Sequence, residues 1–262
     1  MKWSRNAEEA LTRVPFFVRK RVRKKVEEEA IARGDREVDL LHVKSCQQRF
    51  LTNMEKEVRG FQVEQCFGSN GCPNQALKNE GLASEIEEVL ARKNLKEFLK
   101  QRVVGSLRLH RQLRISISDC PNACSRPQIV DIGIIGSRRP TVGRELCSQC
   151  GACVEVCRER AIELAADQDF PILMQDNCVG CGQCIDTCPT HTLCEMQKGY
   201  RVLLGGKLGR HPQLGTELNG VYSAEQIVTI VHQCLDHYCR HNLRGERFGE
   251  ILNHQPLEIE IS

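Results

Sequence analysis

The distribution of cysteines constrains the fold of this chain more than any other feature of its sequence. Of 16 cysteines, eight lie in two runs with the spacing C-x2-C-x2-C-x3-C, which read CSQCGACVEVC at 147–157 and CVGCGQCIDTC at 178–188. Four thiols this close together are a pattern by which proteins hold metal clusters. Gly180 and Gly182 let the backbone wrap closely around such a group, because they lack a Cβ. The sequence therefore predicts a small module built around metal at residues 141–198.

This double run resembles that of bacterial two-cluster ferredoxins, in which the fourth cysteine of each run binds the cluster of the other run. The resemblance implies two [4Fe–4S] clusters with exchanged fourth ligands. One would be held by Cys147, Cys150, Cys153 and Cys188, and the other by Cys178, Cys181, Cys184 and Cys157. Pro189 follows the second run as the pattern requires, whereas Arg158 stands in the equivalent position of the first run. The alternative interpretation is a structural zinc site.

A third group of cysteines comes earlier in the chain. It consists of CFGSNGCP at 66–73 and ISDCPNACSRP at 117–127, whose spacings C-x5-C and C-x3-C suit one further [4Fe–4S] cluster. Gly68 and Gly71 allow a tight first loop. The predicted ligands are Cys66, Cys72, Cys120 and Cys124. The alternative is four buried thiols that bind nothing.

The sequence patterns of these two segments, CxGSxxCP and CPNxC, resemble the siroheme–[4Fe–4S] region of sulfite and nitrite reductases. The segment GYRVLLGGKLGRHPQLGTEL at 199–218 resembles the part that closes the same half-domain. The resemblance implies that Cys124 bridges the cluster to a siroheme iron. It also implies that basic residues contact the siroheme carboxylates, and guanidinium groups suit that role geometrically. The candidates are Arg108, Arg111, Arg114, Lys207 and Arg210, for which exposed surface charge is the alternative.

The first 45 residues have a different character. The segment RVPFFVRKRVRKKVE at 13–27 resembles a small domain known from the C-terminal end of protochlorophyllide reductase. Its apolar residues recur every four positions, from Val18 to Ala30, and predict a helix with a narrow buried stripe. Six cations lie between Arg19 and Lys25. They form either a solvated face or a docking surface for an acidic partner or for the edge of an anionic cofactor.

Composition excludes several classes of function. With 37 Lys and Arg against 34 Asp and Glu, the net charge of +3 does not indicate a nucleic-acid partner. No apolar segment approaches the roughly 20 residues of a membrane span. A disulfide-rich secreted protein is disfavoured by the grouping of the cysteines and by the lack of a signal peptide. We therefore expect a cytoplasmic protein under reducing conditions.

These observations predict an α+β fold of three parts. Residues 1–45 would form a protochlorophyllide-reductase-like helical domain, and residues 46–140, continued at 199–262, a sulfite-reductase-like α/β half-domain. Residues 141–198 would be a two-cluster ferredoxin-like module inserted between them. Within the half-domain, Ser84 and Glu87 have the S-x-x-E spacing of a capping box and predict the start of a helix.

Two functional hypotheses follow. In the first, the ferredoxin-type clusters pass electrons to a siroheme-linked third centre, and the chain is a sulfite or nitrite reductase or a subunit of one. In the second, the chain is a siroheme-free, three-cluster electron-transfer subunit of a larger redox complex. The basic residues and the closing segment favour the first. The lack of a second, ferredoxin-like half before Cys66 favours the second. A redox partner protein is expected in both, and no catalytic residue is assigned.

Overall fold

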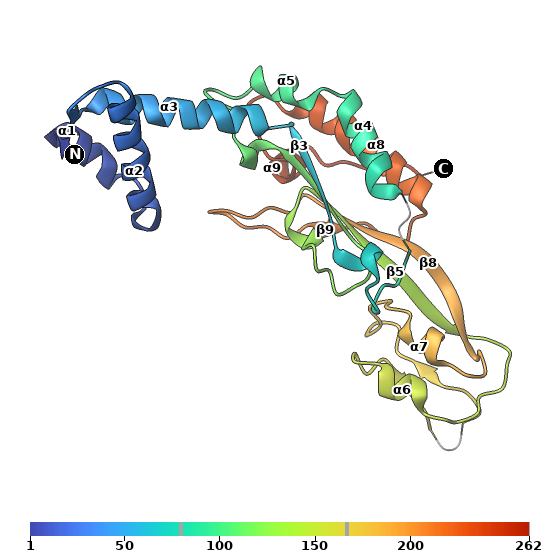
Figure 1. The fold of residues 1–262 in the computed structure, drawn as a ribbon. Helices are drawn as coiled ribbons and strands as arrows, with labels where there is room; N and C mark the ends of the chain where they lie inside the picture. Colours follow the sequence, from blue (N-terminus) through green and yellow to red (C-terminus); the bar gives the residue numbers. More distant parts are fainter. Residues whose placement is uncertain (79–80, 166–167, 262) are drawn as a thin grey trace. The chain divides into compact units, whose positions relative to one another are not determined.

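The structure is a computed structural model that describes residues 1–78, 81–165 and 168–261. It divides into two units (Figure 1). The first unit comprises Met1–Arg59 and Val104–His110, and the second Gly60–Val103 and Arg111–Ser262. The three-part division that we predicted remains a prediction, and its first boundary falls within one continuous helix, α3.

The first unit is helical. Its elements are β1 (Lys2–Trp3), α1 (Arg5–Thr12), α2 (Phe16–Ala32), β2 (Glu37–Val38) and α3 (Leu40–Glu57). Ser4 caps α1 by accepting a hydrogen bond from the N–H of Ala7, and β1 pairs with β2 in parallel. On α2 the stripe of apolar residues faces inward, because Val26 and Ala30 are fully buried and pack with Ala7 and Val38. The cations that surround the stripe are mostly exposed.

The second unit is built on a mixed five-stranded sheet with the strand order β3-β4-β5-β8-β9. The strands are β3 (Phe61–Gln65), β4 (Leu113–Ser118), β5 (Ile132–Val142), β8 (Leu193–Leu204) and β9 (Thr216–Glu217). The first three are parallel, whereas β8 and β9 run antiparallel to their neighbours. Apolar residues on β4 and β5, such as Ile117 and Ile134, are fully buried, as is usual for a parallel sheet covered on its faces.

Helices cover this sheet. They are α4 (Leu82–Arg92), α5 (Leu95–Lys100), α8 (Ala224–His241) and α9 (Phe248–His254), with short 3-10 turns at Phe67–Asn70, Leu109–Arg111 and Pro127–Ile129. Helices α4 and α8 lie side by side (Figure 1) and contact β3 and β8. A capping box between Ser223 and Gln226 begins α8.

The capping box that we predicted at Ser84 is wrong. Helix α4 begins two residues earlier, at Leu82, so that Ser84 lies inside its first turn. Gly81 precedes the helix with φ of 96°. A left-handed glycine at this point turns the chain, and the buried side chain of Leu82 then anchors the first turn. Tertiary packing thus sets this helix start in place of the local polar motif.

The cysteine-rich insert, residues 143–192, connects β5 to β8. It contains α6 (Ala152–Val156), β6 (Ile162–Glu163), β7 (Ile172–Leu173) and α7 (Gln183–Thr187). Because β5 and β8 pair along their length, the insert lies at the end of a two-stranded ribbon (Figure 1). The predicted α+β class is confirmed by this combination of sheet and helices. Among the described residues, no helix has the length and apolar character needed to cross a membrane.

Candidate metal centres

The two cysteine runs of the insert have the same backbone conformation. In each run a left-handed glycine, Gly151 (φ 77°) or Gly182 (φ 76°), immediately precedes a five-residue helix, α6 or α7. The position two residues before that glycine is also left-handed, and it is occupied by Gln149 (φ 56°) in the first run and by Gly180 (φ 74°) in the second. The repeated spacing of cysteines therefore corresponds to a repeated local fold.

The first site, the Cys178 site, is a pocket between the two cysteine runs. Four thiols line it, namely those of Cys178, Cys181, Cys184 and Cys157. Burial, together with negative charge on the other three sulfurs, raises the pKa of Cys184 to about 12. The N–H of Ala161 donates to Cys157 Sγ at 3.3 Å. The pocket thus joins three cysteines of the second run to the last cysteine of the first.

The second site, the Cys147 site, is a further pocket between the two runs. Its cysteines are Cys147, Cys150, Cys153 and Cys188. Burial raises the pKa of Cys153, and the charges of Cys147 and Cys188 act in the same direction. For Cys188, burial alone would raise the pKa, but hydrogen bonds from Leu193 and Thr190 outweigh it and lower the pKa. The exchange of fourth cysteines between the runs is therefore present in both pockets.

The third site, the Cys120 site, lies where β3 and β4 end. Because these strands are parallel neighbours, the loops that follow them emerge at the same edge of the sheet. The loop after β3 carries Cys66 and Cys72, and the loop after β4 carries Cys120 and Cys124. Burial raises the pKa of Cys120, and the nearby thiols of Cys124, Cys66 and Cys72 contribute to the rise. The fold thus brings all four predicted ligands into one neighbourhood.

Polar donors surround the sulfurs of the Cys120 site. The N–H groups of Gly68 and Asp119 donate to Cys66 Sγ at 3.4 and 3.3 Å, and Asn122 Nδ2 donates to Cys124 Sγ at 2.9 Å. Gly68 is needed for space, because a Cβ there would lie 2.4 Å from Asp119 Oδ2. Gly71 has φ of 95° and closes the loop before Cys72, as we expected. Cys124 alone among the four cysteines is exposed.

The donor sets fit iron–sulfur clusters. Each site offers four thiols and at least one backbone N–H directed at a sulfur, the environment that such clusters require. One further donor is available beside the Cys178 site: the buried Ser137 hydroxyl, next to Gly180, has no hydrogen-bond partner in the described part of the chain. Across the same described ranges, no three Cys, His, Asp or Glu side chains are arranged to hold a single metal ion.

The predicted siroheme-contacting cations are mostly engaged with the protein itself. Arg111 Nη1 donates to the Gly245 carbonyl at 2.7 Å. Arg114 pairs with Glu64 at 3.2 Å, and Lys207 pairs with Glu250 at 2.8 Å. Arg108 and Arg210 are exposed, and Arg108 belongs to the first unit. Their assignment to siroheme remains a prediction. The Nε of Arg114 is buried and has no partner within the described residues.

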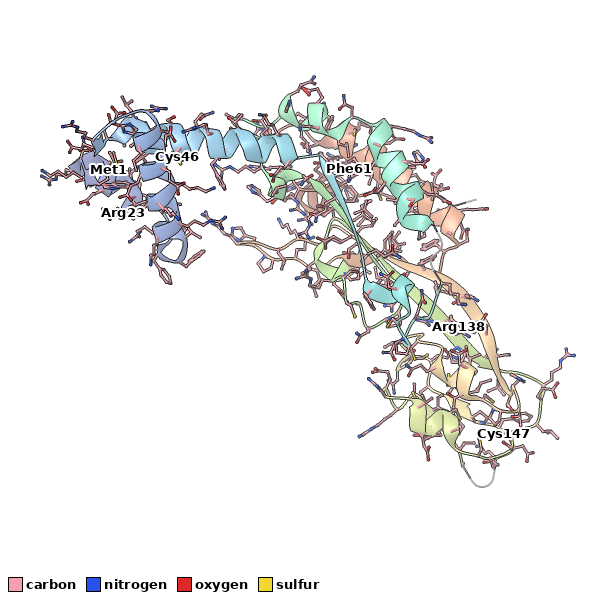
Figure 2. The ribbon with its side chains drawn as sticks, in the orientation of Figure 1. Met1, Arg23, Cys46, Phe61, Arg138 and Cys147 are labelled. Carbon is pink, nitrogen blue, oxygen red and sulfur yellow. The ribbon has the colours of Figure 1, made fainter. Side chains whose placement is uncertain are left out.

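Sequence reasoning missed Asp119 and Arg138. Asp119 is fully buried beside Cys120, and its position immediately before a predicted ligand was the only available signal. Arg138, on β5 next to the insert (Figure 2), binds Asp186 through two hydrogen bonds and Glu195 through a third. Its partners lie 48 and 57 residues further along the chain, so no local motif announces them.

Comparisons with known proteins identify the family. Residues 59–258 match the nitrite and sulphite reductase 4Fe-4S domain, and residues 3–46 match the proto-chlorophyllide reductase 57 kD subunit. A coenzyme F420-dependent sulfite reductase of Methanocaldococcus jannaschii is 37% identical over 182 residues, which are 70% of this chain and 27% of that protein. One of the subunits of the anaerobic sulfite reductase of Salmonella typhimurium is 27% identical over 144 residues, which are 49% of this chain and 38% of that protein.

Among solved structures, dissimilatory sulfite reductase I aligns with a TM-score of 0.48 and 16% identity, over 74% of this chain and 49% of that one. The chain therefore matches less than two thirds of the length of each of these relatives. The family model, in contrast, accounts for more than half of the chain and includes every cysteine of the three sites. This chain belongs to the nitrite and sulphite reductase 4Fe-4S domain family, carries an N-terminal protochlorophyllide-reductase-like domain and is an iron–sulfur protein.

Proposed function

We propose that this chain is an electron-transfer protein that holds three [4Fe–4S] clusters, in which the ferredoxin-type pair of the insert supplies electrons to the Cys120 site. The observation that carries the proposal is the exchange of fourth cysteines: Cys157 lines the pocket of the second run, and Cys188 lines that of the first. When bound, the clusters would supply one-electron redox chemistry, and siroheme would add an iron able to bind sulfite or nitrite.

The residues around the sulfurs would tune this chemistry. Backbone N–H groups directed at Cys66, Cys147 and Cys157 stabilise negative charge on sulfur. Such donors favour the reduced form of a cluster, because reduction adds a negative charge. Free thiols in this number also need a reducing environment, so a cytoplasmic location and a redox partner protein are part of the proposal.

Within this proposal, a siroheme-linked third centre is the first candidate. The supporting observation is Cys124, whose thiol is exposed while Cys120 is buried. An exposed ligand of the third cluster is free to contact a second group on its outer side, which is the role that the family resemblance implies for it. A sulfite or nitrite reductase activity, in this chain or in an assembly that contains it, would follow. The sulfite reductase names of the two relatives support that substrate class.

A siroheme-free electron-transfer subunit is the second candidate. It is favoured because three of the five cations expected to neutralise siroheme already bind other residues of this chain. These three are Arg111, Arg114 and Lys207. The Salmonella relative is, by its name, one subunit of an anaerobic sulfite reductase, so a protein with this domain is known as part of a larger assembly. In this case the third cluster would pass electrons to another protein.

Iron analysis and an absorption spectrum of anaerobically purified protein test these proposals together. Three four-iron clusters give about twelve iron atoms per chain. About thirteen atoms with tetrapyrrole absorption support the siroheme-linked candidate, because siroheme adds one iron, and about twelve atoms without that absorption support the second candidate. A value of about eight would remove the Cys120 site from the proposal. A Cys120→Ser variant is the matched control, since it should lower the iron content from about twelve to about eight.

A further inference from the structure

Strand β5 physically joins the Cys120 site to the Cys178 site. At Gly136 the strand packs on the residue before Cys120, because a Cβ at Gly136 would lie 2.5 Å from the carbonyl oxygen of Asp119. Two residues later, the N–H of Arg138 donates to the Gly180 carbonyl at 2.7 Å, and Arg138 forms a β-bridge with Cys181. Residues two apart in a strand are separated by about 7 Å. The backbones of the two sites are therefore linked through a very short segment.

A second contact joins the same two sites. Gln183 Nε2 donates to Asn74 Oδ1 at 3.1 Å. Gln183 immediately precedes Cys184 of the Cys178 site, and Asn74 lies two residues after Cys72 of the Cys120 site. Both contacts come from the second cysteine run. The two runs are alike in local fold, and these two contacts place the Cys178 site next to the Cys120 site.

Arg138 fixes this orientation. Its side chain is only 14% exposed and bridges helix α7 to the sheet. Nη1 and Nη2 donate to the two oxygens of Asp186 on α7 at 2.9 and 2.8 Å, and Nε donates to Glu195 on β8 at 2.6 Å. A Cβ at Gly182 would lie 2.9 Å from Arg138 Cβ, so the run packs directly on this side chain. A bidentate guanidinium contact restricts the rotation of the two groups relative to each other, whereas a single hydrogen bond leaves that rotation free.

We infer that Arg138 and Gln183 are positioning residues that hold the Cys178 site against the Cys120 site, and that the Cys147 site is the outer one, which a redox partner protein faces. The inference rests on the proposed function, because it orders the sites of that electron path. The exposed thiol of Cys150 agrees with an outer position for the Cys147 site. Arg138 acts through the placement of the cysteines, and it needs no contact with a cluster.

The test is electron paramagnetic resonance of the full chain, purified anaerobically and reduced with dithionite, with iron content measured on the same samples. The signal of the Cys120 site should show magnetic interaction with a neighbouring cluster. We expect Cys181→Ala to abolish this interaction and Cys150→Ala to leave it in place. Arg138→Ala should weaken it without loss of iron. Arg138→Lys keeps the charge but not the two-pronged contact, and it should restore the interaction only in part.

Arg201→Ala is the matched control, because Arg201 makes a similar two-pronged pair with Glu217 at the β8–β9 end of the sheet. It should leave the interaction unchanged. If Arg138→Ala fails to retain iron, Gln183→Ala replaces it as the test variant. It removes a half-buried side chain and its hydrogen bond to Asn74, and it should also weaken the interaction.

The outcomes separate this inference from the proposed function. About eight iron atoms in the unmodified chain would overturn both. About twelve, together with an interaction that is lost in Cys150→Ala and kept in Cys181→Ala, would overturn the order of sites alone. An interaction unaffected by both Arg138→Lys and Gln183→Ala would overturn the positioning role of these residues.

Discussion

The buried ion pair between Asp131 and Arg247 provides a test of how the second unit is held together. Arg247 Nη2 and Nε donate to the Asp131 carboxylate at 2.7 and 3.2 Å, and the N–H of Arg114 donates to it at 2.8 Å. The carboxylate is 1% exposed, and the guanidinium is 18% exposed. Burial raises the pKa of Asp131, and the charge of Arg247 opposes that rise. The pair connects the start of β5 to the start of α9.

Replacing Arg247 by Met leaves the Asp131 charge buried without its main partner. Loss of one partner of a buried pair costs about 3–5 kcal/mol, and the partial exposure of Arg247 places the expected cost at about 3 kcal/mol. In a unit of this size, 1 kcal/mol shifts the thermal midpoint by about 2–4 °C, so we expect a decrease of about 6–12 °C. Circular dichroism during anaerobic heating measures this shift.

Two variants make the result specific. Arg201→Met removes a more exposed pair, with exposures of 21% and 39%, and should cost no more than about 1 kcal/mol. Combining Arg247→Met with Asp131→Asn removes the uncompensated charge and should recover most of the lost stability. If Arg247→Met lowered the midpoint no more than Arg201→Met does, the reasoning from burial would be refuted.

Three further predictions concern the sites. Cys188→Ser should remove the cluster of the Cys147 site, although Cys188 belongs to the second run, and lower iron from about twelve to about eight atoms. Gly68→Ala places a Cβ 2.4 Å from Asp119 Oδ2 and should cost the Cys120 site its cluster while the electron paramagnetic resonance signals of the insert persist. The hydrogen bond from Lys207 lowers the pKa of Glu250 below 4.5. The ionised carboxylate therefore stabilises the parent protein above that pH, and this stabilisation is lost as the pH falls below it. Glu250→Gln should lack this contribution.

Each of these has a contrary result. Damage by Cys188→Ser confined to the Cys178 site would contradict the exchange of ligands. Gly143→Ala, where the nearest atom to the new Cβ is 3.3 Å away, is the control for Gly68→Ala, and equal losses of iron in both would contradict the steric argument. For Glu250→Gln, the difference in thermal midpoint from the parent protein should shrink as pH decreases below 4.5, and a constant difference would count against the ion pair.

The sequence predicts this protein best where the determinants are local. The first three cysteines of each run line one pocket, because α6, α7 and their left-handed glycines repeat with the cysteine spacing. The capping box at the start of α8 is equally local, because Ser223 and its partner Gln226 are three residues apart. Ser84 shows the limit of such motifs, since the turn at Gly81 and the burial of Leu82 decide where α4 begins.

Pairings between distant residues could not be predicted. Arg114 and Lys207 were identified as cations available to siroheme, yet their partners Glu64 and Glu250 lie 50 and 43 residues away. The sequence shows where a charged residue occurs, but only the fold determines which oppositely charged residue it pairs with. The same limit applies to Arg138, which joins β5, α7 and β8 through contacts that only the folded chain brings together.

The engaged cations do not by themselves exclude siroheme, because such pairs are weak. The Arg114–Glu64 pair has exposures of 28% and 31%, and pairs of this kind contribute about 0.2–1 kcal/mol. An anionic ligand that offers carboxylate oxygens to the guanidinium compensates readily for its loss. The decision between the two candidates therefore rests on Cys124 more than on the cations.

The loop that carries Cys124 is strained and firmly held. Ala123 and Arg126 have left-handed φ values of 54° and 59°, which cost about 1–3 kcal/mol each in residues other than glycine. Between them, Ser125 is held by a hydrogen bond of 2.6 Å between its hydroxyl and that of Ser118, and its carbonyl accepts one from Ser116 Oγ at 2.7 Å. A strained loop that holds an exposed thiol in place is expected for a cysteine that contacts a second group in addition to its own cluster. This favours the siroheme-linked candidate.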